Sequence, residues 1–196
     1  MILLLGLLAQ MPPQTVLTIP AEYRLIEGVA SDGETIWVSS ILDRVIVEHN
    51  GGKFRAMPMP DGAGAPFAIA YDASRKWIWI AANCLEALKI KGCTGAWLVA
   101  MDRSGKVRRK VRPANDAAFT PGDVSVWQDQ VFVSDTANGA VYRCQAACKT
   151  LTPLIARAGK RLLIVGDAQW SAHLPDKDGK VSGVQKPTPI VAIPAR

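Results

Sequence analysis

The chain of 196 residues has few of the side chains that several common kinds of catalysis need. It has only two histidines, His49 and His173, and no Gly-x-Ser-x-Gly motif, so the sequence gives little support to Ser–His catalysis. Gly159-Lys160 is followed by Arg161 rather than by Ser or Thr, which excludes a phosphate-binding loop. No stretch approaches the ~20 apolar residues of a membrane-spanning helix, so no membrane span is expected.

The chain has little net positive charge over most of its length. The net charge is +6, but residues 149–196 contain eight Lys and Arg against three Asp, so the first 148 residues are nearly neutral. A nucleic-acid-binding protein is expected to carry positive charge on its folded surface, interleaved with aromatic side chains. The sequence therefore predicts no nucleic-acid partner.

What the sequence does contain is a repeated pattern of strands. Residues 121–143 form three short stretches rich in Val, Tyr, Phe and Trp, with Asn138-Gly139 supplying a tight turn. The same pattern occurs 95 residues earlier, and residues 69–83 hold a third copy. The matched positions include Val29 with Val124, Val38 with Val133, Ser39 with Ser134, and Trp37 with Trp79. Repeated units of this kind indicate a β-propeller.

The repeats divide the chain into three regions. Residues 1–20 are expected to be an export signal and linker, residues 21–160 hold three blades, and residues 161–196 hold part of a fourth blade and an irregular basic tail. Leu162–Val165 is a candidate strand of that fourth blade, and Pro187 and Pro189 are expected to break any strand in the tail. The predicted fold class is all-β, a partial β-propeller of four-stranded antiparallel blades. Its ring is incomplete, so an open blade edge is expected to pair with another chain.

The N-terminus and the cysteines both indicate export. Met1–Gln10 has the apolar region of a secretory signal, although it lacks a basic start, and Met11-Pro-Pro13 ends regular structure directly after it. Four cysteines allow three pairings, and local pairing of Cys84 with Cys93 and of Cys144 with Cys148 is favoured because each pair lies within one repeat. Zinc binding by these cysteines is a weaker alternative, since no histidine lies near either pair. Disulfides require an oxidising compartment, so the protein is expected to be periplasmic or secreted.

A run of basic residues closes the second repeat. Val107, Arg109 and Val111 are predicted on one face of a strand, and Lys106, Arg108, Lys110 and Arg112 on the other. Such a strand suits the exposed outer edge of a blade, where Lys and Arg prevent sheets from aggregating. An anion-binding patch is the alternative, but no aromatic residue or Gly-rich segment accompanies the run in the sequence.

Three groups of segments carry a resemblance to a known family. They are Ile26-Glu-Gly-Val-Ala-Ser-Asp-Gly33 with Trp37-Val-Ser-Ser40, Ile69-Ala-Tyr-Asp72 with Trp79-Ile-Ala-Ala82, and Pro121-Gly-Asp-Val124 with Val133-Ser-Asp-Thr136 and Val141-Tyr142. They resemble the senescence-marker-protein/gluconolactonase/luciferin-regenerating-enzyme family of six-bladed propellers. The resemblance covers roughly Tyr23 to Leu154.

The resemblance implies a metal site. Enzymes of this family hold a divalent cation, calcium or zinc, at the mouth of the central channel, with Glu, Asn and Asp ligands. In this chain Glu27, directly before Gly28, stands at the position of the glutamate ligand. Phe67 stands at the matching place in repeat two and cannot bind a metal, and repeat three has Asp123 one residue later than expected. Glu27 and Asp123 are therefore the candidate metal ligands, and Asp123 is also the candidate catalytic residue.

Each of these residues also has a structural interpretation. Glu27 can be a solvated carboxylate or a partner of Arg24, and Asp123 can cap its own turn. Asp135 is expected to accept backbone N–H bonds in the turn that follows it. The aromatic residues at repeat-matched positions are expected to form the core between blades; they are Trp37, Trp77, Trp79 and Phe132.

Two functions are consistent with this sequence. The first is an exported gluconolactonase-like propeller that acts on a small-molecule substrate as a metal-assisted lactone or ester hydrolase when complete. The second is a non-catalytic propeller that binds a small ligand or a protein partner. If the site exists, Glu27 and Asp123 should lie at the same end of the blades, and should either bind a cation or raise the pKa of one carboxyl.

Overall fold

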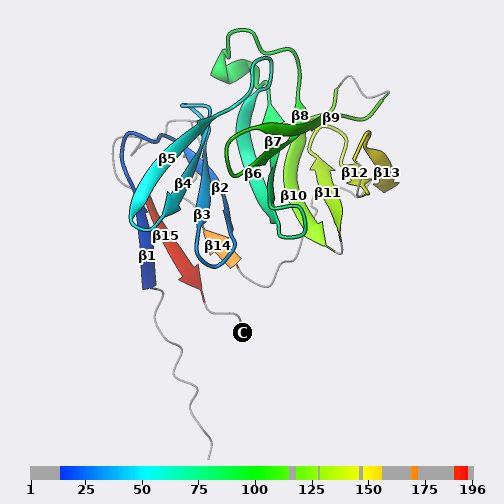
Figure 1. The fold of residues 1–196 in the computed structure, drawn as a ribbon. Coiled ribbons are helices and arrows are strands. Elements are labelled where there is room, and N and C mark those ends of the chain that lie inside the picture. The colour runs from blue at the N-terminus through cyan, green and yellow to red at the C-terminus, as the bar shows by residue number, and fades with distance from the viewer. Residues whose placement is uncertain are drawn as a thin grey trace, which may run out of the picture.

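The fold consists of three four-stranded antiparallel sheets and a smaller fourth sheet (Figure 1). This computed structural model describes residues 14–114, 118–127, 129–145, 148–155, 169–171 and 188–193. Each large sheet takes four consecutive strands in chain order. Blade one contains β2 (Ile26–Ser31), β3 (Ile36–Ser40), β4 (Val45–Asn50) and β5 (Lys53–Pro58). Blade two contains β6 (Ala65–Asp72), β7 (Trp77–Asn83), β8 (Trp97–Asp102) and β9 (Val107–Val111). Blade three contains β10 (Pro121–Trp127), β11 (Gln130–Asp135), β12 (Val141–Cys144) and β13 (Thr152–Ile155). The predicted partial propeller with three four-stranded blades is confirmed.

The three innermost strands pair with their second strands in equivalent ways and share one irregularity of register. Val29 pairs with Val38, Ile69 with Ile80, and Val124 with Val133. In each blade the register shifts by one residue just before this pair, because the inner strand holds a β-bulge. The prediction that Val29, Ile69 and Val124 occupy equivalent strands is therefore confirmed, and the repeat includes the bulge.

The blades stack face to face, with β2 lying against β6 and β6 against β10. The core between blades one and two contains Trp37, Ile46, Ile78 and Ile80, and the core between blades two and three contains Trp79, Leu98, Phe119, Val124, Val133 and Tyr142. Trp37 and Trp79 are fully buried at matched positions, as predicted. Strand β7, the second strand of blade two, is almost wholly buried because another sheet covers each face of that blade.

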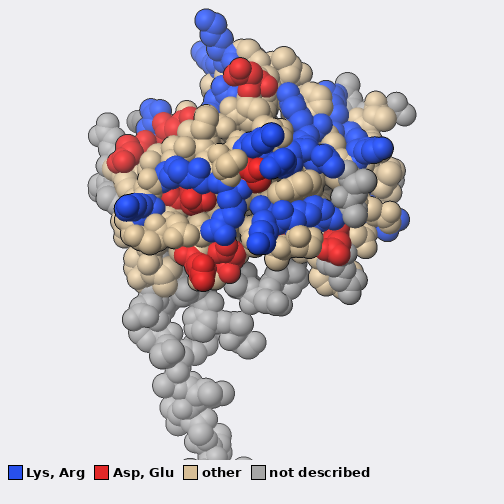
Figure 2. Space-filling view, viewed as in Figure 1, with Lys and Arg blue, Asp and Glu red and all other residues tan. Residues whose placement is uncertain are grey.

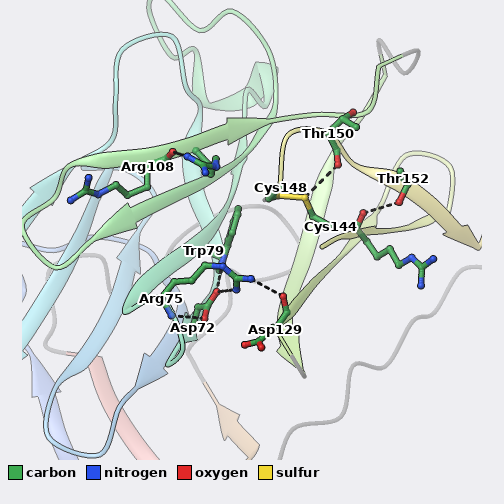
Figure 3. Close-up of a disulfide and its surroundings, with 11 residues drawn as sticks. Asp72, Arg75, Trp79, Arg108, Asp129, Cys144, Cys148, Thr150 and Thr152 are labelled. Carbon is green, nitrogen blue, oxygen red and sulfur yellow. Dashed lines mark hydrogen bonds and ion pairs between the residues drawn. A yellow bond between two sulfur atoms is a disulfide. The ribbon is translucent and has the colours of Figure 1, made fainter. Parts of the chain in front are cut away.

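A buried ion pair supports the contact between blades two and three. Arg75 Nη1 lies 2.5 Å from Asp72 Oδ2, and Arg75 Nη2 donates to the Asp129 carbonyl of blade three (Figure 3). Trp79 Nε1 also donates to Asp72. Burial raises the pKa of Asp72, but hydrogen bonds from Ser74, Arg75 and Trp79 outweigh it, so this pKa is lowered overall. Asp72 is therefore expected to remain ionised and to hold Arg75 in place.

The fourth sheet joins the two ends of the described chain. Its order is β1 (Gln14–Ile19), β15 (Thr188–Ile193) and β14 (Gln169–Ser171), and Ile19 packs with Ile26, Val38 and Val47 of blade one. Residues 14–19 thus form a strand where a linker was expected.

The expectation of an irregular tail is wrong for residues 188–193. Pro189 lies within β15, opposite Thr18 of β1, whereas β14 pairs only with Val191–Ile193. Proline has no backbone N–H to donate to a neighbouring strand. It is tolerated at this position because no β14 residue stands opposite it. The predicted strand Leu162–Val165 and the leader Met1–Gln10 lie outside the described residues.

Both predicted disulfides are present, Cys84–Cys93 and Cys144–Cys148 (Figure 3 shows the second). Each closes a short loop within its own blade, with Cα atoms 5.8 Å and 5.1 Å apart. The first loop contains a single 3-10 turn, Glu86–Leu88. The disulfides are consistent with an oxidising, extracytoplasmic compartment. Within the residues that the structure describes, no helix has the length and apolar character to span a membrane.

Candidate site at the start of the inner strands

The candidate residues Glu27 and Asp123 lie in the bulges that open β2 and β10. In blade one the Gly28 N–H donates to Ser39 Oγ at 2.7 Å, and in blade three the Asp123 N–H donates to Ser134 Oγ at 2.9 Å. These serines occupy equivalent positions in β3 and β11, so the two bulges are held in the same way. Both residues therefore lie at the end of the blades where the inner strands begin.

Close contact between blades explains why Gly28 follows Glu27. A Cβ atom at Gly28 would lie 2.5 Å from the Phe67 carbonyl oxygen and 2.9 Å from the Ile69 nitrogen of β6. Only glycine permits this approach of two backbones. Gly28 thereby brings β2 against the inner strand of blade two, and the neighbouring Glu27 is partly buried.

Glu27 has an incompletely satisfied carboxylate. Its Oε2 is buried and accepts no hydrogen bond from any residue that the structure describes. Burial, and secondly the negative charge of Asp123, raise the pKa of Glu27 to about 7. Arg24, its alternative partner in the sequence, instead binds Asp43 through its side chain at 2.5 Å. Glu27 is therefore a partly buried acid without a counter-ion in the described part of the chain.

One carboxylate oxygen of Asp123 accepts a hydrogen bond within its own strand. Its Oδ1 accepts the Val124 N–H at 2.8 Å, which agrees with the structural interpretation of this residue. Burial raises its pKa, and the Val124 bond opposes that rise. Because the side chain still contacts solvent, we expect Asp123 to ionise before Glu27. Its other oxygen remains available to a ligand, and its charge acts on Glu27.

A third oxygen donor lies at the same end of the blades. Asn83 pairs with Ala65 at the start of β6, and its side-chain nitrogen donates to the Pro121 carbonyl of β10. Its Oδ1 is buried and, among the described residues, has no partner. The sequence did not indicate Asn83 as a candidate because it ends a second strand rather than opening an inner one. An Asn at the end of an otherwise apolar strand was the available signal.

Other candidates have structural roles. Asp135 Oδ1 accepts backbone bonds from Thr120 at 3.2 Å and Ala137 at 2.9 Å, which confirms its predicted role in the turn. The His49 ring packs 4.8 Å from Phe54 in blade one. No group of three or more His, Cys, Asp or Glu side chains arranged for a metal ion occurs in the described ranges. The candidate site therefore offers two carboxylates and one amide oxygen.

Comparisons with known proteins indicate the fold only. No family model matches the sequence, and no curated protein matches it. Virginiamycin B lyase from Staphylococcus aureus, in selenomethionine-substituted form, superposes with a TM-score of 0.55 at 9% identity, over 85% of this chain and 51% of the lyase. A catalytically inactive form of that lyase with quinupristin gives a TM-score of 0.54 at 15% identity, over 69% of this chain and 42% of the lyase. Glutaminyl cyclase from Myxococcus xanthus gives 0.48 at 12% identity, over 88% and 74% of the two chains.

The two virginiamycin B lyase structures, with TM-scores above 0.5, show that the chain has a β-propeller fold. The chain spans only about half the length of the lyase, 42% to 51% of it. At such low identity the likeness extends to the fold and not to the activity of the lyase. These comparisons do not reproduce the senescence-marker-protein/gluconolactonase resemblance in the sequence.

Proposed function

We propose that this chain is part of an exported, gluconolactonase-like propeller that binds a divalent cation at Glu27 and Asp123 and hydrolyses a lactone or ester. The observation that carries the proposal is the buried, unpartnered Oε2 of Glu27 next to a second carboxylate. The negative charge of Asp123 helps to raise the pKa of Glu27, and a bound cation would relieve that repulsion. The two disulfides support the exported location.

The donor atoms favour a hard cation. Glu27, Asp123 and Asn83 offer only oxygens, which suits calcium better than zinc, although carboxylates bind zinc also. When bound, a divalent cation polarises a carbonyl oxygen and lowers the pKa of bound water. Asp123, as the acid that ionises first, would accept the proton of the attacking water. Glu27 would be ionised when it holds the cation, so binding should release a proton near neutral pH.

A non-catalytic propeller is the second candidate function. It is favoured by the Val124 N–H bond to Asp123, since that carboxylate already has a role in its own strand. In this alternative Glu27 is a protonated buried acid, and the same end of the blades binds a small ligand or a protein without chemistry. Cation binding distinguishes the two.

Calorimetric titration with calcium and with zinc tests the proposal. We expect measurable binding to the wild type, a loss of at least about 10-fold in affinity for Glu27→Gln and for Asp123→Asn, and no change for Glu86→Gln on the exposed 3-10 turn. The affinity of the wild type should fall as the pH is lowered below about 7, because protons compete for Glu27. Equal, weak heats for the wild type and Glu27→Gln would exclude the metal site. Cation binding without hydrolysis of δ-gluconolactone or phenyl acetate would favour the binding propeller.

A further inference from the structure

Strand β9 forms the outer edge of blade two and is strongly basic. The segment from Lys106 to Arg112 contains five Lys and Arg and no acidic residue. In the sheet order β6-β7-β8-β9 its outer edge pairs with no described strand. The other two outer strands differ, because β5 ends in Pro58 and β13 contains Pro153. Among the three large blades, β9 is thus the outer strand best suited to accept another strand.

A bulge changes which side chains share a face of this strand. Val107 pairs with Met101 and Arg109 with Ala100, so Arg108 is the additional residue. Met101 belongs to the core toward blade one, whereas Ala100 and Leu98 belong to the core toward blade three. The prediction that Val107 shares a face with Arg109 and Val111 is therefore wrong. Beyond the bulge, Arg109, Lys110 and Val111 continue in regular register with β8.

Tryptophans from neighbouring strands support the basic side chains. Arg109 lies over the Trp77 ring, 5.4 Å from its centroid, on one face of the blade. Lys110 and Arg112 lie over the Trp97 ring, at 4.5 Å and 5.4 Å. Such contacts hold long cationic side chains in fixed positions, which reduces the entropy lost when they bind an anion. The aromatic groups that the sequence run lacks are therefore supplied by the fold.

Among the described residues, Lys106 and Lys110 meet little negative charge. Asp102 pairs with Arg108 at 2.6 Å, whereas Lys106 and Lys110 form no ion pair with any residue in the described ranges. Figure 2 shows Lys and Arg side chains gathered over the part of the surface that β9 crosses in Figure 1. The edge would repel the β9 edge of a second copy and attract an acidic strand.

We propose that β9 and its tryptophan-supported cations bind an extended acidic segment of a partner protein, which adds to blade two as a further strand. Side chains on one face of an extended peptide recur every two residues, about 6.6 Å apart, and Lys110 and Arg112 are likewise two residues apart in the chain. Carboxylates on alternate residues of the partner would therefore meet the cations of one face together. Backbone bonds to the free edge add affinity that charge alone does not give. Because of the bulge, regular pairing is expected along Arg109–Val111.

Fluorescence anisotropy with a labelled peptide of about ten residues, alternating Glu and Thr, tests this proposal. The wild type should bind this peptide but not its Lys-Thr counterpart, and binding should weaken as salt is raised. The same acidic peptide with alternate backbone nitrogens methylated should bind several-fold more weakly, because it retains its charge but loses donors on one edge. Equal binding of the methylated peptide would overturn the strand addition, and no binding of the acidic peptide would overturn the whole proposal.

Two matched variants locate the site. Lys106→Gln with Lys110→Gln should weaken binding by roughly 3- to 10-fold. Lys53→Gln with Lys91→Gln removes the same net charge from exposed positions outside β9, and should change the affinity by less than about two-fold. Equal weakening by both variants would show a general charge effect and overturn the assignment to β9. Tighter binding of heparin or a single-stranded oligonucleotide than of the peptide would also contradict the proposal.

Discussion

Among single residues, Glu27 departs furthest from ordinary behaviour. Its carboxylate has a buried oxygen without a described partner, and its pKa is raised from 4.5 to about 7 by burial and by Asp123. A carboxyl with a raised pKa binds its proton more tightly in the folded protein than in the unfolded chain. Glu27 therefore favours folding in its protonated form, and this contribution is lost as the pH rises from about 4.5 through about 7.

Replacing Glu27 by Gln should remove that pH dependence. Near pH 8, in the absence of divalent cations, we expect Glu27→Gln to be more stable than the wild type by about 2 kcal/mol, since Gln keeps the shape without the charge. At about pH 5 the two proteins should have similar free energies of unfolding. Urea denaturation across this pH range measures the difference. A wild-type profile that runs parallel to that of the variant would show that Glu27 titrates normally.

At the scale of the strands, the sequence predicted the elements better than their irregularities. Alternating Val, Ile and Trp in three matched segments was sufficient to identify the inner strands, because packing between blades buries them in the same way in every repeat. The bulges were not predicted, since a one-residue register shift depends on the partner strand. That is why Asp123, one position later than Glu27 in its repeat, was doubtful from the sequence alone.

Pairing between strands far apart in the chain could not be predicted from the sequence for the same reason. Residues 14–19 and 188–193 carry no repeat pattern, and they pair with each other across almost the whole chain. Asn83 was missed because its carbonyl partner, Pro121, lies in the next blade. The pairing of the cysteines was easier to predict, since each disulfide closes a loop within one blade.

The Cys84–Cys93 disulfide should contribute to stability mainly by restricting the unfolded chain. Its sequence separation of 9 residues corresponds to roughly 2 to 3 kcal/mol by the loop-closure relation. Cys84→Ser with Cys93→Ser should lower the free energy of unfolding by that amount, and addition of a reductant should change the variant less than the wild type. Peptide mapping without reduction should recover Cys84 linked to Cys93 and Cys144 linked to Cys148. Crossed pairs would contradict the structure.

At the scale of the whole molecule, the described chain is a stack of sheets whose outer blades each have one neighbour. Blade two is covered on both faces, by blade one and by blade three. Blade one is covered on its other face by β1, through Ile19 and Leu17. The fourth sheet thus depends on both ends of the described chain, and blade one depends on the fourth sheet.

This dependence makes a prediction about cooperativity. Val191 lies in the central strand of the fourth sheet, opposite Thr15 of β1 and Ser171 of β14. Val191→Pro would remove a backbone donor from a strand paired on both sides, which is expected to cost roughly 3 kcal/mol or more in that sheet. Because β1 covers the apolar face of Ile26, Val38 and Val47, its release should extend to blade one.

Hydrogen exchange followed by mass spectrometry can measure how far the effect travels. In Val191→Pro, amides of β1 and β15 should exchange fastest, those of β2 and β3 should lose part of their protection, and those of β10 and β11 should change little. Blade three shares no described core with the fourth sheet, which is the reason for this gradient. Uniform loss of protection across all three blades would mean that the molecule unfolds as one cooperative unit. Unchanged exchange in blade one would mean instead that the fourth sheet contributes nothing to its stability.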